Sequence, residues 1–127
     1  HTIVCGRTKD ENWIFDVDPR GNVEEHTHRG FCVTGSGAFV GQFTVQSLAH
    51  LEVTRKQLYQ GQLVGYRIID DIIRAGIWGV GGRIQMFLLD TSGIRQLSES
   101  KLDDLAVNVG VWKQIENEAL RDVKTAE

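Results

Sequence analysis

The chain has 127 residues, of which 41% are apolar and 24% charged, the composition of one ordinary globular domain. Its formal net charge is −3 and its Lys and Arg residues are scattered, so it lacks the basic patch that follows nucleic-acid phosphates. Because no apolar stretch approaches the roughly 18 residues of a membrane span, and no basic-then-apolar leader is recognisable, we expect one cytoplasmic domain over residues 1–127, with no nucleic acid and no membrane as partner.

The two cysteines favour the same setting. Cys5 and Cys32 each lie in an apolar, strand-like run, where a free cysteine usually behaves as a small buried hydrophobe, and two thiols do not make a disulfide framework. We therefore expect two buried thiols in a reducing compartment. Since the sequence opens with His1-Thr2, we expect a processed product, a fragment, or a chain with a tag residue at its start.

The first part of the chain has strand patterns. Residues 2–5 and 13–17 are rich in β-branched and aromatic side chains and predict a hairpin. Asp18-Pro19-Arg20-Gly21 predicts a type I turn, because proline presets the second turn position and glycine suits the fourth. Residues 22–26 then return as a polar edge strand, and the apolar run 31–33 predicts a buried strand.

From Ala38 the apolar residues recur at helical spacing and predict a helix over about 38–52. Thr54-Arg55-Lys56-Gln57 matches a capping box, in which a hydroxyl and an amide satisfy backbone donors at a helix start. A second helix should therefore run to about Ala75. Its apolar stripe is wide enough to pack on a sheet and on the first helix together, with Asp70 and Asp71 on its solvent side.

A glycine-rich segment, residues 76–82, ends the second helix, and its Trp78 is the aromatic residue that we expect at a subunit contact. Residues 84–89 and 94–97 flank the turn 90–93 and predict a second hairpin. Strands, two helices, strands and a helix in this order predict one α+β layered domain.

The last segment predicts a third helix. Ser98 or Ser100 can cap its start, and apolar residues follow the three-four alternation as far as Val123. Glu116 alone interrupts the apolar face. We expect Trp112, on that face, to lie in the core.

Several short strings in this order resemble one known family. Thr34-Gly35-Ser36-Gly37-Ala38 follows the first strands, Gly79-Val80-Gly81-Gly82 follows two helices, and the turn 90–93 leads into Leu97-Ser98, while the turn 18–21 is similar to the family's Asp-Pro-x-Gly. Their order and spacing resemble the C-terminal half of proteasome β-subunits and their bacterial relatives, which are N-terminal-nucleophile (Ntn) hydrolases. The resemblance covers most of the chain, is strongest over 31–120, and implies a partial α-β-β-α layered sandwich.

The resemblance also implies a reaction. In that family the hydroxyl of an N-terminal threonine attacks a peptide carbonyl while its own amine takes the proton. The nucleophile and its assisting lysine and aspartate belong to the half that would precede His1, so the resemblance implies a chain that is not catalytically competent alone. Thr2 would become N-terminal if His1 were removed, but too few residues separate it from Gly35 to build the missing strands. No nucleophile is recognisable.

Of the family's catalytic auxiliaries, only Ser36 transfers to this chain. The alternative to a catalytic role is that Ser36 is a small cap in a tight strand-to-helix turn. Ile77 and Val80 stand where the family has an auxiliary aspartate and serine before the Gly-Gly turn. They favour an alternative, a non-catalytic assembly, scaffold or ligand-binding protein of the same fold. An unrelated ligand-binding α+β domain would be supported if the helices packed on one face of a single open sheet.

Three other motifs are weaker indications of a functional site. His26-x-His28 with Cys32 could hold zinc, because alternate residues of an extended segment share one side, but no fourth ligand stands out. We therefore expect a surface loop with a pH-sensitive charge, and neither a metal nor a cofactor. Gly79-Val80-Gly81-Gly82 lacks the Gly-Lys-Ser/Thr ending of a phosphate loop. Thr34 replaces the first glycine of a serine-hydrolase elbow.

Half of a two-sheet sandwich leaves one apolar sheet face uncovered. Exposed apolar patches beyond a few hundred Å² usually mark a binding surface. We therefore expect a homo-oligomer, or a missing N-terminal segment of the same subunit that covers this face.

Overall fold

The computed structural model describes residues 1–124 and has a mixed α+β architecture, as the sequence predicted. A three-stranded antiparallel sheet precedes the helices in the chain, and a two-stranded hairpin lies between the second and third helices. The elements are β1 (Thr2–Arg7), β2 (Asn12–Val17), β3 (Val23–Glu25), α1 (Ala38–Ser47), the 3-10 turns η1 (Ala49–Leu51) and η2 (Val53–Arg55), α2 (Leu58–Arg74), β4 (Phe87–Asp90), β5 (Gly93–Gln96) and α3 (Glu99–Asp122).

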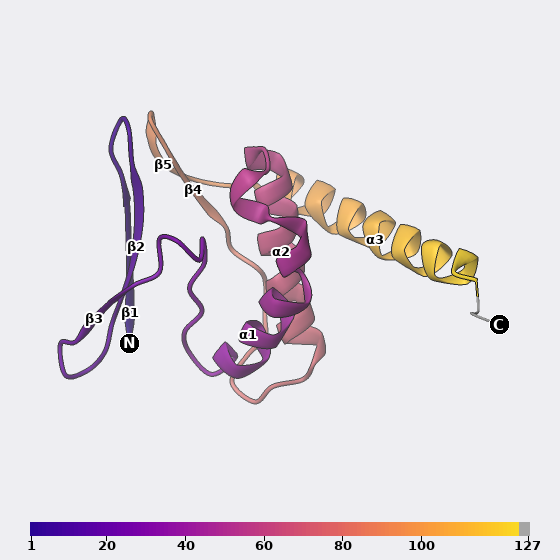
Figure 1. Cartoon of the computed structure of the whole chain (residues 1–127), viewed down its shortest axis with the longest axis horizontal. Helices are drawn as coiled ribbons and strands as arrows, with labels where there is room; N and C mark the ends of the chain where they lie inside the picture. Colours follow the sequence, from indigo (N-terminus) through magenta and orange to yellow (C-terminus); the bar gives the residue numbers. More distant parts are fainter. Residues whose placement is uncertain (125–127) are drawn as a thin grey trace.

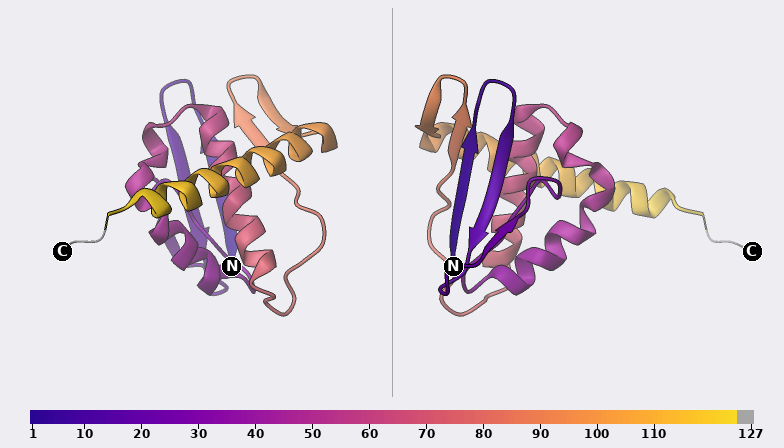
Figure 2. Two further views of the ribbon diagram at one scale, coloured as in Figure 1. Left: turned by 90° about the vertical axis from the view of Figure 1, so that its right-hand side faces the viewer. Right: turned by 60° about the vertical axis from the view of Figure 1, so that its left-hand side comes forward.

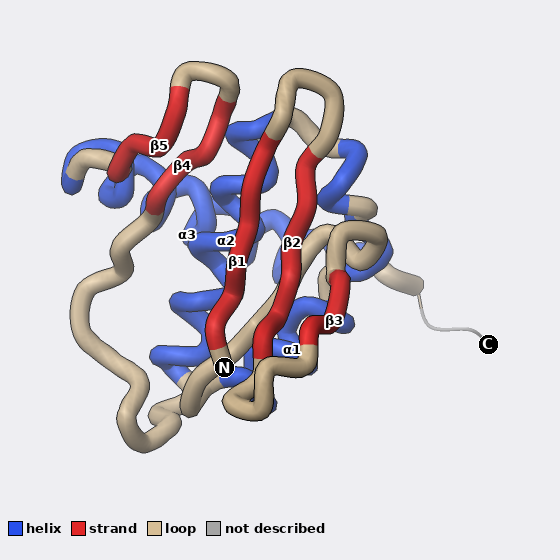
Figure 3. The backbone as a smooth tube through the Cα atoms, turned by 90° about the vertical axis from the view of Figure 1, so that its left-hand side faces the viewer, coloured by secondary structure: helices blue, strands red, loops and turns tan. Residues whose placement is uncertain are grey.

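The strands form one layer and the helices lie on one side of it (Figure 1). β4 runs beside β1, so the second hairpin continues the layer of the first sheet (Figure 3). α3 crosses α2 on the side away from the strands (Figure 2). No helix within residues 1–124 is long and apolar enough to cross a membrane.

The first hairpin and its turn confirm the sequence prediction. β1 pairs with β2 along its whole length, with Thr2 opposite Val17. In the turn that follows, the Gly21 N–H donates to the Asp18 carbonyl at 2.9 Å, and Gly21 has a φ of +85°, which glycine adopts without steric cost. β3 then pairs back with β2, with Phe15 opposite Glu25.

The register gives the three-stranded sheet two different faces. Asp16 faces the helices, since its carboxylate meets side chains of the segment between β3 and α1. Because successive side chains alternate, Trp13 and Phe15 point the other way, together with their cross-strand neighbour Val4. No described element covers this outer face (Figure 3), and Val23 on it is 62% exposed.

Three element boundaries differ from the sequence prediction. The helix expected over 38–52 ends at Ser47 and continues only as 3-10 turns, because Glu52 is left-handed, with a φ of +49°. The capping box expected at 54–57 is wrong. Thr54 lies inside η2, so extended Gln57 becomes the cap, and its backbone N–H donates to Gln60 Oε1 at 3.1 Å. The hairpin strand expected from residue 84 begins at Phe87, preceded by one backbone hydrogen bond from the Leu97 N–H to the Met86 carbonyl at 2.9 Å.

The strand expected over 31–33 is also wrong, because this apolar run is an extended loop between sheet and helices. Its side chains are half-buried without joining a ladder. A methyl group of Val33 lies only 2.6 Å from where a Cβ on Gly41 would stand, so the loop packs directly on α1. The burial expected of Cys5 is wrong too, since this residue is exposed.

One cluster of the core lies between the second hairpin, α2 and α3. Its buried members are Leu88, Leu97 and Leu105, surrounded by the partly buried Leu63, Tyr66, Met86 and Leu102. Ser98 caps α3 by accepting a hydrogen bond from the Lys101 N–H at 3.3 Å, which confirms the first of the two expected caps.

Charged side chains join α2 to α3. Arg67 donates two hydrogen bonds to Glu116, at 2.6 and 2.9 Å, and stacks 4.2 Å above the ring of Trp112. Lys113 donates a hydrogen bond to Asp71 at 2.6 Å. Asp71, which we expected on the solvent side of α2, therefore contacts α3. Glu116 thus interrupts the apolar face in order to pair, and Trp112 is half-buried under Arg67 instead of lying in the core.

Candidate functional site

Two glycine turns far apart in the sequence meet at one end of the molecule. Gly35 has a φ of +92°, and its carbonyl accepts a hydrogen bond from the Ala38 N–H at 3.0 Å, which presents Ser36 at the start of α1. The Ser36 Oγ lies 3.5 Å from where a Cβ on Gly79 would stand. Ser36 therefore contacts the segment that follows α2.

The chemistry around Ser36 is sparse. Its hydroxyl is exposed, and Gly79 beside it has no side chain that could take or give a proton. Val80 packs near Gly37, with a methyl group 3.3 Å from where a Cβ on that glycine would stand, and Ile77 is half-buried. Both side chains are hydrocarbon, so these contacts supply packing and no catalytic group.

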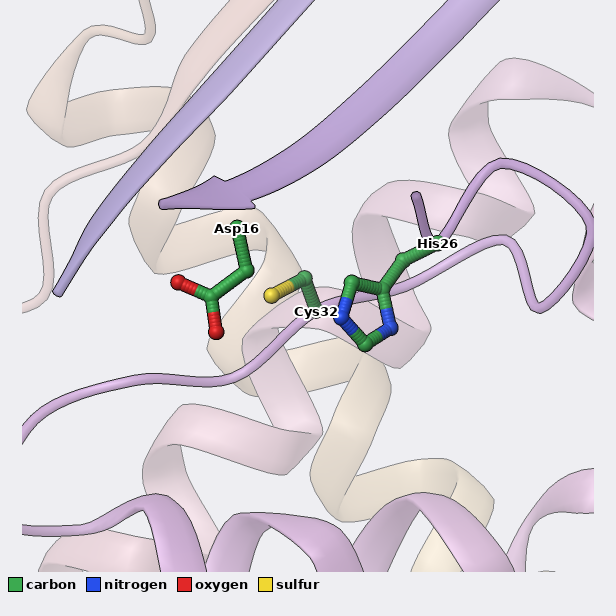
Figure 4. A group of neighbouring side chains, drawn as sticks. All are labelled: Asp16, His26 and Cys32. Carbon is green, nitrogen blue, oxygen red and sulfur yellow. The ribbon is translucent and has the colours of Figure 1, made fainter. Parts of the chain in front are cut away.

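A second cluster lies between the sheet and the helices. A carboxylate oxygen of Asp16, a ring nitrogen of His26 and the sulfur of Cys32 all lie within 4.8 Å of one another. Figure 4 shows the three side chains converging from β2, from the residue after β3, and from the loop that follows. The cluster joins a carboxylate, an imidazole and a thiol.

Backbone hydrogen bonds fix the position of His26. Its N–H donates to the Ile14 carbonyl at 2.9 Å, and the Ile14 N–H donates to Thr27 Oγ1 at 3.1 Å, so the β2–β3 pairing continues one residue beyond β3. His26 therefore lies opposite Ile14, and Asp16, two residues along β2, shares its face of the sheet. Glu24, the partner of Asp16, lies on this face as well.

In this cluster a buried imidazole nitrogen lacks a hydrogen-bond partner among the described residues, and negatively charged carboxylates lie nearby. His26 is 7% exposed, and its Nε2 has no hydrogen-bond partner within the described chain. A buried polar atom without a partner destabilises a fold by about 1–3 kcal/mol. Glu24 Oε2 is 3.7 Å from this nitrogen, and His1 Nδ1 is 3.3 Å from Asp16 Oδ1. Burial raises the pKa of the Cys32 thiol, and the negative charges of Asp16 and Glu24 raise it further.

These contacts correct the prediction for the His26-x-His28 motif. His26 is buried under the sheet instead of lying in a surface loop, while His28 is exposed and outside the cluster. Sequence reasoning also missed Asp16. The signal was available, because the turn at 18–21 fixes which residues of the two strands share a face.

A cleft of about 440 Å³ opens between the two first helices. Its lining includes Val45 and Leu48 from the α1 side, Val64 and Ile68 from α2, and the charged Arg29, Glu52 and Arg55. Comparison with family models, curated proteins and solved structures found no match to this chain.

Proposed function

We propose that the chain is the C-terminal portion of a proteasome-like Ntn-hydrolase subunit, of the threonine-type peptidase family, and that it has no peptidase activity alone. The observation that carries the proposal is the contact between the two glycine turns. In the family that the sequence resembles, the Gly-Ser-Gly serine and the residues before the Gly-Gly turn serve one active site, so they must be neighbours. Here Ser36 Oγ lies 3.5 Å from where a Cβ on Gly79 would stand.

The outer face of the three-stranded sheet is the second support. An α-β-β-α sandwich buries one face of each sheet against the other sheet, so that face must be apolar. Trp13, Phe15 and Val4 occupy the outer face, and the two aromatic rings pack with centroids 5.5 Å apart. In the proposed subunit the preceding catalytic portion supplies the sheet that covers them.

The side chains at the turns support the lack of activity. The reaction needs a nucleophile and a group that accepts its proton. Ser36 has beside it Gly79, which has no side chain that could accept a proton. Ile77 and Val80, in place of the family's auxiliary aspartate and serine, favour the second candidate below. Ser36 therefore needs a catalytic threonine from another segment.

The test begins with the intact mass of the protein from its native source. The mass should correspond to a longer chain with an N-terminal threonine, and a peptide electrophile that reacts with both the hydroxyl and the free amine of such a threonine should label it. Ser36→Ala in that longer chain should slow peptide hydrolysis, while Ser100→Ala, an exposed serine in the first turn of α3, should not. A native chain that begins near His1 and takes no label would reject the peptidase proposal.

The second candidate is a non-catalytic assembly or scaffold protein of the same fold. The packing of Val80 near Gly37 favours it, because a hydrocarbon contact there stabilises the turns without serving a reaction. The cleft between α1 and α2 favours a ligand-binding version. The position of the helices on one side of the strand layer is instead the arrangement that we expected of an unrelated ligand-binding α+β domain, although the strands form two sheets and not one. Unlabelled native protein in a stable complex would support the scaffold, and a bound small molecule would support the ligand-binding version.

A further inference from the structure

We propose that Asp16, His26 and Cys32 bind a zinc ion, with Glu24 as the fourth ligand. The inference does not rest on the proposed function, because the cluster lies on the helix-facing side of the sheet and Ser36 lies in the turn before α1. A zinc site here would hold the β2–β3 end of the sheet to the loop that leads into the helices.

The distances suit one small cation. The three ligand atoms lie within 4.8 Å of one another. Ligands around tetrahedral zinc stand about 3.5 Å apart, given Zn–S near 2.3 Å and Zn–N and Zn–O near 2.0 Å. Closing the cluster therefore needs movements of about 1 Å, which side-chain torsions supply while the backbone hydrogen bonds of His26 remain.

The unpartnered imidazole nitrogen points into the cluster. His26 is buried, and its Nε2 has no hydrogen bond within the described residues. In Figure 4 the ring edge that carries this nitrogen is turned toward the Cys32 sulfur. A metal ion would satisfy the nitrogen, because neutral imidazole is a common zinc ligand.

The combination of donors selects the metal. Thiolate and imidazole together favour zinc and similar borderline-soft ions over Mg²⁺ and Ca²⁺, which prefer oxygen ligands. On binding, Zn²⁺ replaces the proton of the Cys32 thiol, which leaves to solvent. The negative charges of Asp16 and Glu24 attract the cation, and His1 Nδ1, 3.3 Å from Asp16 Oδ1, can orient that carboxylate.

Glu24 is the best fourth ligand among the described residues. It is the cross-strand partner of Asp16, and its Oε2 lies 3.7 Å from His26 Nε2. Its side chain is 66% exposed, so it can swing onto the metal without disturbing the packing. This exposure predicts that removing Glu24 weakens binding less than removing any of the other three ligands.

The first experiment adds Co²⁺, a spectroscopic substitute for Zn²⁺, to the metal-free full chain with a non-thiol reductant. We expect one bound ion per chain, the intense visible bands of tetrahedral cobalt, and a thiolate-to-cobalt charge-transfer band, all displaced by one equivalent of Zn²⁺. Cys32→Ser should abolish the charge-transfer band. Asp16→Asn and His26→Gln should each weaken Zn²⁺ binding by at least about tenfold, since even lost outer contacts weaken metal sites that much.

Two matched controls separate this site from its neighbours. Cys5→Ser removes the other thiol, which lies on the same sheet face but is exposed, and should leave the cobalt spectrum unchanged. His28→Gln removes the exposed histidine of the same motif and should also change nothing. Loss of the spectrum in either control would contradict the assignment.

A second experiment needs no variant and so does not depend on variants that fold. The wild-type chain is alkylated with iodoacetamide, with and without Zn²⁺, and the modified cysteines are located by mass spectrometry. Zn²⁺ should slow the alkylation of Cys32 by about tenfold or more, because the bound thiolate is shielded, while Cys5 should react at the same rate. Equal rates at Cys32 with and without Zn²⁺, or a wild-type chain without the charge-transfer band, would overturn the proposal.

Discussion

Leu105→Ala tests whether the core between the second hairpin and α3 holds the domain together. Leu105 is 1% exposed and contacts a cluster whose other buried members are Leu88 and Leu97. Leucine-to-alanine changes in a core destabilise by about 2–5 kcal/mol, through lost transfer free energy and the cavity that remains. Four members of this cluster are only partly buried and can move inward, so we expect the lower part of that range, about 2–3 kcal/mol.

The matched control is Leu120→Ala, on the same helix but 71% exposed. It changes the same atoms without leaving a cavity, so the free energy of unfolding should change by no more than about 0.5 kcal/mol. Urea unfolding of both variants, followed by tryptophan fluorescence and far-UV circular dichroism, gives the two values if the transitions coincide. A loss below about 1 kcal/mol for Leu105→Ala, or equal losses in the two variants, would refute this location of the core.

Three further predictions concern a charge pair, a helix cap and the outer sheet face. Hydrogen bonds from Arg67 hold the pKa of Glu116 below its ordinary value. The stabilisation from this pair is therefore complete above the pKa that Glu116 has in the unfolded chain, and it is lost as the pH falls through the pKa in the folded chain. In urea unfolding, the free energy of unfolding of wild type should exceed that of Glu116→Gln by at most about 1 kcal/mol at pH 7, and the two should be equal in acid. Ser98→Ala should destabilise by about 1 kcal/mol in the same assay, because Ser98 caps α3; an unchanged midpoint would contradict the cap. We expect the chain to self-associate through the outer sheet face, so Val4→Lys, which places a charge there, should lower the self-association seen by sedimentation velocity, while Val107→Lys, exposed on α3, should not.

Local signals in the sequence predicted the elements that neighbouring residues determine. The turn at 18–21 closes through the Gly21 N–H and the Asp18 carbonyl, both inside the motif. Ser98 caps α3 with a hydrogen bond to a residue three positions away. Such features need no knowledge of the distant chain, which is why sequence reasoning found them.

Tertiary packing determined the elements that sequence reasoning missed. The apolar run 31–33 has the pattern of a buried strand, yet it is a loop, because its hydrophobic side chains pack on α1 and no neighbouring strand pairs with it. Asp71 resembles a solvent-facing residue in a helical pattern and finds Lys113 on α3, 42 positions away. Neither partner is visible in a window of one helix.

Local sequence determines one part of the Asp16 cluster, and tertiary packing determines the other. The turn at 18–21 sets the β2–β3 register, and the alternation of side chains then places Asp16, Glu24 and His26 on one face, so this part was predictable from the sequence. Cys32 was grouped with His26 only because it is near in the chain, and its place beside Asp16 was not predictable, because that place depends on the path of a loop between the sheet and the helices. The sequence motif grouped His26 with His28 and Cys32, whereas the fold keeps Cys32 beside His26, leaves His28 outside the cluster and adds Asp16.

Both proposals follow from one unusual feature of the three-stranded sheet. An antiparallel sheet with helices on one side ordinarily turns its apolar residues toward them and its polar residues toward water. Here the faces are mixed: Asp16, Glu24 and His26 lie on the helix-facing side together with Ile3 and Ile14, and Trp13 and Phe15 lie on the open side together with Glu25. In the two proposals, a second sheet removes Trp13 and Phe15 from water, and a cation satisfies the buried imidazole and the carboxylates on the other face. Because these two groups lie on opposite faces, covering the outer face should leave the affinity for Zn²⁺ unchanged, and removing the metal should leave the outer face able to associate.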